Sequence, residues 1–207
     1  DKPAGLLTIP VDKEDGAHED TVLSRVREYM DRRRGPGGYV GTLCVAQKSM
    51  RLFVMRPAAR PPAAPVDFPP ATGGGERFRG PMEVVVIDLA RVFADSRNGR
   101  MEPDARYERV CGTIPAELGA SPDMALDATE DTAYFRIGRD AAAKHLPAGT
   151  KLEKTFGPRS MGAGPSGIGR MNLKTGEVSL VTTVGFQVGH IQASPFVPGE
   201  IMFCWET

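Results

Sequence analysis

The sequence has few cysteines, no excess of either charge and no long apolar run, and each scarcity excludes a class of protein. Three cysteines among 207 residues, with no C-x-x-C pair, do not make a disulfide framework, and their odd count favours a reducing compartment. Lys plus Arg and Asp plus Glu both number 26, so the basic face of a nucleic-acid binder is missing. The chain contains no run of 18 or more apolar residues, so the sequence predicts no transmembrane helix. We therefore expect neither nucleic acid nor membrane as a partner.

Histidine is also scarce, which bears on metal binding. The three histidines, His18, His145 and His190, lie far apart and form no H-x-H or H-E-x-x-H motif. The residues therefore predict no metal site in this chain. No charged segment followed by an apolar one opens the sequence, and we expect a cytoplasmic rather than a periplasmic protein.

What the chain has in abundance is glycine and proline. Its 24 glycines and 18 prolines make up about a fifth of the sequence, above the usual share of about 12 %. They concentrate in residues 57–80 and 138–167, which we interpret as loops or insertions. Residues 95–106 also look irregular. Hydrophobic residues, at 41 % of the chain, suffice for a core between these stretches.

The apolar pattern divides the chain into two parts. Residues 1–38 are polar apart from 20–34, where apolar residues recur at spacings of three and four and predict a helix. Residues 39–207 are dominated by short β-compatible runs, with one short helical segment at 140–145. The predicted strands cover 39–46, 51–56, 82–89, 107–114, 132–137, 168–173, 178–184, 189–193 and 200–205.

Two pairs of segments indicate an internal repeat. MEVVVIDLARV at 82–92 is similar to IGRMNLKTGEV at 168–178, and SMRLFVMR at 49–56 is similar to DTAYFRIGR at 131–139. Without one insertion of roughly 25–30 residues the period is about 50, near the ~40–50 residues of a propeller blade. A blade is a four-stranded antiparallel sheet. The predicted fold is therefore all-β: a partial β-propeller of about three blades with a short N-terminal helix.

Several residues are candidates for a binding site, each with a simpler alternative. The G-x-G-x-x-G at 162–167 contains proline and precedes a strand-like run, so we interpret it as a loop and predict no nucleotide binding. His190 follows a glycine at the start of a predicted inner strand, where it either faces a ligand channel or bonds to a neighbouring blade. Arg136, Arg139 and Arg170 either face an anion or protect a sheet edge.

The C-terminal 40 residues carry an ordered set of motifs. They are NLKTGE at 172–177, GH at 189–190, PG at 198–199 and FCWE at 203–206. In this order they resemble the middle of the oligogalacturonate lyase family, although Trp205 stands where some members have histidine. The resemblance implies a seven-bladed β-propeller that cleaves pectin-derived oligogalacturonides by β-elimination. It also implies a manganese-type metal held by His and Gln, with a catalytic His and Arg, all downstream of the FCxE strand.

These implications set the expectations for this chain. It contains no counterpart of the family's base, arginine or metal ligands, so we expect no catalytic residue or cofactor here, a manganese-type metal only in a full-length member, and no activity of the chain alone. Expected partners are an oligogalacturonide and the rest of the same propeller. Alternatives are a non-catalytic TolB-like propeller that binds a protein or glycan, and a stand-alone β-rich domain. The predicted substrate-binding residues are His190, Gln192, Glu206 and Arg170.

Overall fold

The computed structural model describes residues 43–58, 80–100, 107–121, 123–155 and 161–205. Residue contacts divide the chain into two units, Asp1–Val40 and Gly41–Thr207, and every described residue belongs to the second. The helix predicted at 20–34 and the predicted boundary after residue 38 lie outside the described residues.

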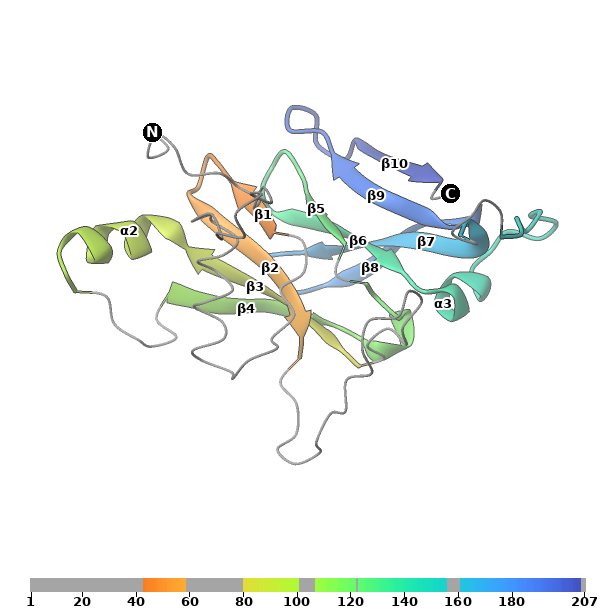
Figure 1. The fold of residues 1–207 in the computed structure, drawn as a ribbon, viewed down its shortest axis with the longest axis horizontal. Helices are drawn as coiled ribbons and strands as arrows, with labels where there is room; N and C mark the ends of the chain where they lie inside the picture. Colours follow the sequence, from red (N-terminus) through yellow and green to blue (C-terminus); the bar gives the residue numbers. More distant parts are fainter. Residues whose placement is uncertain (1–42, 59–79, 101–106, 122, 156–160, 206–207) are drawn as a thin grey trace, which may run out of the picture. The chain divides into compact units, whose positions relative to one another are not determined.

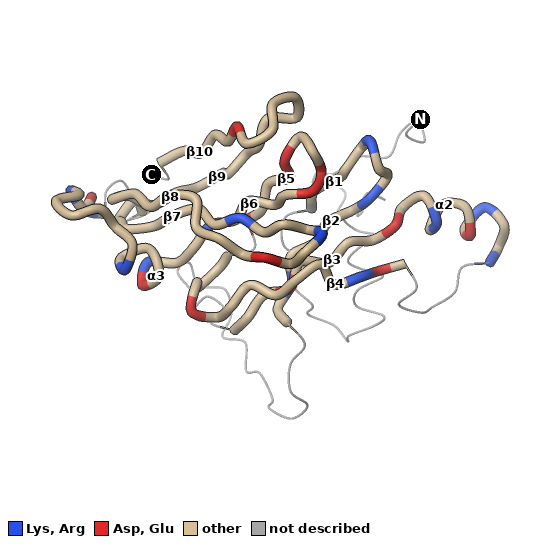
Figure 2. Tube along the Cα trace, turned by 180° about the vertical axis from the view of Figure 1, so that it is seen from behind, with Lys and Arg blue, Asp and Glu red and all other residues tan. Residues whose placement is uncertain are grey.

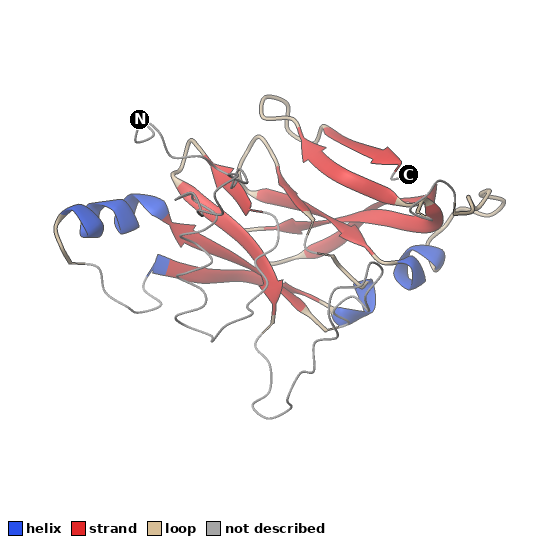
Figure 3. Ribbon diagram, in the orientation of Figure 1, coloured by secondary structure: helices blue, strands red, loops and turns tan. Residues whose placement is uncertain are grey.

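The described residues form three antiparallel sheets, which confirms the all-β prediction (Figures 1 and 3). In the first two sheets the strand order follows the chain order, and the third has two strands. The first sheet holds β1 (Leu43–Ala46), β2 (Arg51–Pro57), β3 (Met82–Asp88) and β4 (Glu108–Ile114). The second holds β5 (Met124–Leu126), β6 (Thr132–Ile137), β7 (Ala163–Asn172) and β8 (Val178–Phe186). The third holds β9 (Val188–Ala193) and β10 (Ile201–Trp205).

The repeated segments occupy equivalent places in the first two sheets. The similar segments 49–56 and 131–139 contain β2 and β6, the second strand of each sheet. The segments 82–92 and 168–178 contain β3 and much of β7, the third strands. The sequence repeat therefore corresponds to a repeated four-stranded meander.

The core lies on both faces of the second sheet. One apolar cluster joins it to the first sheet, and another joins it to β9 and β10. The first cluster includes Phe53, Met55, Val84, Phe135, Ile137 and Met171. The second includes Ala125, Tyr134, Ile168, Val188 and Ile191. Alternate residues of β6 thus face opposite clusters, as the two-residue period of a strand requires.

One glycine makes room for Phe135, the largest completely buried side chain of the second sheet. A Cβ on Gly169 of β7 would lie 2.7 Å from the ring of Phe135, which is completely buried. No side chain fits that gap without moving the ring. Glycine at this position therefore lets the backbone of β7 pass directly over the aromatic ring.

The segment predicted as a loop at 162–167 is largely strand, and this prediction was wrong. β7 begins at Ala163, and its Ser166 and Gly167 pair with Val184 and Thr183 of β8. Small residues allow this pairing, because a Cβ on Gly164 would collide with the backbone of Gly185.

Two further elements were missed and one short helix was found. α2 (Leu89–Arg97) buries no side chain, so it leaves no apolar period in the sequence; Asp88 caps it by accepting a 2.9 Å hydrogen bond from the Arg91 amide. β5 has only three residues and gave no pattern. The helix predicted at 140–145 is confirmed as α3 (Arg139–Ala143). A 3-10 turn covers Ala116–Leu118. No helix in the described ranges combines the length and the apolar character needed to cross a membrane.

The hairpin turns that begin the three sheets are hydrogen-bonded to one another. Glu130, in the β5–β6 turn, accepts bonds of 2.9 and 3.0 Å from the amides of Lys48 and Ser49 in the β1–β2 turn. Asp127, in the same acidic turn, accepts a 2.7 Å bond from the amide of Gly199 in the β9–β10 turn. The acidic turn lies beside the basic β1–β2 hairpin (Figure 2). It therefore connects all three sheets at one end.

These bonds change the acidity of both carboxyls. Burial alone would raise the pKa of Glu130, but the bonds from the Ser49 hydroxyl and from the amides of Lys48 and Ser49 outweigh it, and the pKa lies below its ordinary value. Burial is likewise the largest single influence on the pKa of Asp127, and it is outweighed by the bond from Gly199 and those from Thr129, so this pKa is lowered as well. Both groups therefore favour the ionised form.

Candidate functional site

An irregular pairing between β9 and β10 places His190 and Cys204 together. Gly189 pairs with Cys204 and Gln192 with Met202, so two residues of β9, His190 and Ile191, face one residue of β10. This is a β-bulge, a feature that re-aims side chains. His190 has a φ of 48°, in the left-handed region that usually requires glycine. The bulge thus holds His190 in a backbone conformation that residues with a side chain rarely adopt.

The bulge brings an imidazole to a thiol. Nδ1 of His190 lies 3.2 Å from Sγ of Cys204, and that sulfur lies 3.3 Å from the carbonyl oxygen of Gly189. The thiol can donate its proton to the Gly189 oxygen, or to Nδ1 of His190 when that ring nitrogen carries no proton. Neither sequence motif nor spacing indicated this pair, because Cys204 lies 14 residues away on the other strand.

The structure brings together two of the four predicted substrate-binding residues. His190 and Gln192 are both exposed on β9, whereas Val188 and Ile191 point into the core. Arg170 lies on β7, exposed, and its Nε donates a 3.0 Å hydrogen bond to the hydroxyl of Ser179. Within the described residues no hydrogen bond joins Arg170 to His190. Glu206 lies outside the described residues.

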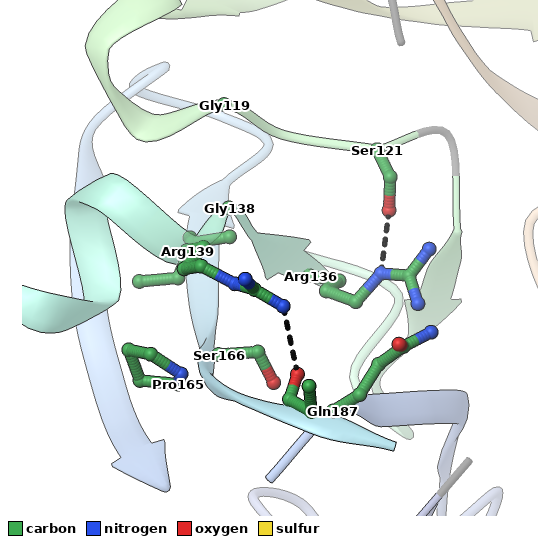
Figure 4. Close-up of a pocket in the computed structure, with 10 residues that line it drawn as sticks. Gly119, Ser121, Arg136, Gly138, Arg139, Pro165, Ser166 and Gln187 are labelled. Carbon is green, nitrogen blue, oxygen red and sulfur yellow. Dashed lines mark hydrogen bonds between the residues drawn. The ribbon is translucent and has the colours of Figure 1, made fainter. Parts of the chain in front are cut away.

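A hollow lies at the end of the second sheet opposite the β5–β6 turn, and two arginines line it (Figure 4). It has a volume of about 80 Å³, which is room for a few waters or for a carboxylate group. No acidic side chain is among its described lining residues. These are Gly119, Ser121, Arg136, Ile137, Gly138, Arg139, Ala163, Pro165, Ser166 and Gln187.

Arg136 is fixed in place by the sheet. Its Nε donates a 2.9 Å hydrogen bond to the hydroxyl of Ser121 (Figure 4). Its Nη1 donates a 2.8 Å bond to the carbonyl of Val188. The second bond reaches β9, so Arg136 also links the second sheet to the third. Ser166 supports the same strand by accepting a 2.7 Å bond from the Val188 amide.

Arg139 lies at the exposed side of the hollow. It is the first residue of α3, and its Nη2 makes one 3.3 Å hydrogen bond to the carbonyl of Ala163. A guanidinium has five N–H donors in a planar fork suited to a carboxylate. Two such groups around a hollow lined by no carboxylate favour a small anion. The segment F-R-I-G-R at 135–139 was the available sequence signal, since a strand ending between two arginines had suggested an anion.

The described residues do not fit a manganese-type centre. No group of three or more His, Cys, Asp or Glu side chains lies close enough to hold a metal ion within the described ranges. The hollow offers only hydroxyl, amide and guanidinium groups among its side chains, and guanidinium is no ligand for a cation. No chemical step is therefore derived through such a metal here.

Comparison of the chain with protein-family models, with curated proteins and with solved structures finds no match.

Proposed function

We propose that strands β1 to β10 form an arc of a β-propeller, with two blades and the first two strands of a third. Three observations support this arrangement. The four-stranded order repeats, β5 contacts both β1 and β9, and successive sheets pack face to face. In a propeller the first strands line the centre and neighbouring blades share a core. The linked hairpin turns then lie at one end of the central strands.

On this arc, the proposed function is recognition of a uronate oligosaccharide by an oligogalacturonate lyase-like propeller. The observation that carries the proposal is the pairing of Arg136 and Arg139 around a hollow sized for a carboxylate. Charge-assisted bonds from guanidinium to carboxylate are about twice as strong as neutral ones. One galacturonate carboxylate would enter the hollow, and the sugar ring would remain on the surface.

The proposal separates binding from cleavage. β-Elimination removes the proton next to a uronate carboxylate, so it needs a base within hydrogen-bond reach and positive charge near the developing enolate. The hollow supplies two cations. Its described lining contains no His, Lys, Tyr, Asp or Glu that could act as the base. We therefore expect these residues to bind a uronate without cleaving it.

Two measurements test the proposal. Incubation with digalacturonate and Mn²⁺ should give no ultraviolet absorbance of an unsaturated uronate; a clear signal would contradict the expected separation of binding from cleavage. Calorimetry should detect binding of digalacturonate and none of uncharged digalactose. Equal binding of both sugars would favour the general glycan-binding alternative.

A matched pair of variants locates the site. Arg139→Gln removes one charge-assisted bond, worth about 1.5–3 kcal/mol, and should weaken digalacturonate binding roughly tenfold or more. Arg97→Gln, on the exposed last turn of α2, removes the same charge elsewhere and should leave affinity unchanged. An unchanged affinity in Arg139→Gln would rule out the hollow as the uronate site.

A further inference from the structure

The three cysteines of the chain differ in their surroundings. Cys111 is buried, whereas Cys44 and Cys204 are both half-buried, and the Cys44 thiol donates a 3.2 Å hydrogen bond to the carbonyl of Met124. Burial raises the pKa of the Cys44 thiol to about 11, and burial also raises the pKa of Cys111. A thiol whose pKa is raised in this way forms little thiolate at neutral pH and reacts slowly. Among the described residues, Cys204 differs from the other two cysteines in having a histidine ring beside its sulfur.

The imidazole beside Cys204 is held there by the backbone. A φ of 48° is rare for a residue with a side chain, and strain of this kind gathers at functional sites. His190 is otherwise exposed, and in the described part of the chain Cys204 Sγ is its side-chain hydrogen-bond partner. A thiol next to a histidine that can take its proton is the pairing used to activate nucleophilic cysteines.

Access to the sulfur comes from the outer face of the β9–β10 pair. His190, Gln192 and Met202 are all exposed, and Met202 pairs with Gln192 across the two strands. None of these three described residues carries a negative charge that would repel an anionic disulfide.

We propose that Cys204 is a nucleophilic thiol that forms a mixed disulfide with a low-molecular-weight disulfide of the glutathione class, with His190 as its proton acceptor. Sγ of Cys204 attacks one sulfur of the disulfide, and the thiol proton passes to Nδ1 of His190. The disulfide S–S bond breaks as the Cys204–sulfur bond forms. The leaving thiolate takes the proton from the imidazolium and departs as a free thiol. The Cys204 sulfur is oxidised, the leaving sulfur of the small disulfide is reduced to a thiol, and an excess of free thiol reverses the exchange.

The test follows labelling of the folded 207-residue chain by oxidised glutathione at neutral pH. Mass spectrometry of peptides from the quenched reaction gives a rate for each cysteine. We expect Cys204 to form the mixed disulfide at least about tenfold faster than Cys44 or Cys111. Equal rates at the three cysteines, or no adduct at Cys204, would overturn the proposal.

Variants of His190 separate proton transfer from backbone strain. Asn accepts the left-handed conformation but is no base, so His190→Asn should slow the reaction of Cys204 about tenfold or more. His190→Gly also removes the base while relieving the strain, and should slow it equally. His145→Asn, which changes an exposed histidine on another segment, should have no effect. Slow labelling of Cys44 and Cys111 verifies that each variant is folded. An unchanged rate in both His190 variants would show that the histidine takes no part.

Discussion

The β5–β8 sheet and the β9–β10 pair begin with the same kind of hairpin, yet they differ in how far they are covered. Both faces of β6 and β7 are packed: Phe135 and Met171 on one face and Ile168 on the other are essentially inaccessible. The β9–β10 pair is packed on one face, while Met202 on the other is 65 % exposed. The irregular backbone and the His190–Cys204 contact occur on the exposed face. The strands that are packed on both faces stabilise the fold, whereas the candidate reactive pair lies on the exposed face of β9 and β10.

The largest expected effect comes from removing a side chain between the sheets. Phe135→Ala leaves a cavity where β6 meets the first sheet, and should lower the free energy of unfolding by about 3–5 kcal/mol. Met202→Ala, on the exposed face of β10, should change it by less than about 0.5 kcal/mol. Chemical denaturation measures both. Comparable losses would mean that the two faces are not distinguished by packing.

A smaller effect is expected at the acidic turn that joins the regions. Glu130→Gln weakens the bonds to Lys48 and Ser49, and should lower the free energy of unfolding at neutral pH by about 1–3 kcal/mol. Glu117→Gln, an exposed residue of the 3-10 turn, is the control and should be neutral.

The same turn predicts a dependence on pH. The pKa values of Glu130 and Asp127 are lowered in the folded chain, so their stabilisation is complete above their ordinary values of 4.5 and 3.8 and is lost as pH falls through the folded values. Stability should therefore decline in acid, and the decline should be shallower in Glu130→Gln. Parallel pH profiles of wild type and variant would contradict this role.

The smallest expected effect isolates the strain at the bulge. His190→Gly and His190→Ala both remove the imidazole, so their difference reports the backbone alone. At a φ of 48° the glycine variant should be more stable by about 1 kcal/mol. At Gln192, which has no positive φ, the alanine variant should instead be more stable than the glycine variant by about 0.5–1 kcal/mol. The same order at both positions would indicate that the bulge is not strained in solution.

The strands of this molecule could largely be predicted from local patterns. β3 and β6 follow from runs of β-branched and aromatic residues, and the similar segments that contain them occupy equivalent places in the two sheets. α2 could not be found by periodicity because it buries nothing, although Asp88 was an available cap signal. The start of β7 was missed because its glycines indicate a loop unless the tight approach to β8 is known.

The candidate sites were less predictable because they depend on long-range contacts. His190 was singled out from its own neighbourhood, but its partner Cys204 is fixed by the pairing of β9 with β10. Arg136 and Arg139 were recognised as possible anion ligands, yet the hollow between them needs Ser121 and Ser166 from other segments. Arg170, not Arg136 or Arg139, was the arginine predicted to bind substrate, although nothing in the local sequence distinguishes the three.

The bonds between the hairpin turns also bear on the order of folding. Lys48 and Glu130 are 82 residues apart, and Asp127 and Gly199 are 72 apart. Closing such long loops is slow compared with forming a local hairpin. Each hairpin should therefore form first, and the carboxylates should engage only as the sheets dock. An interaction that forms after the rate-limiting step of folding changes the unfolding rate and not the folding rate. These two acidic residues would therefore set the lifetime of the folded chain rather than the speed at which it folds.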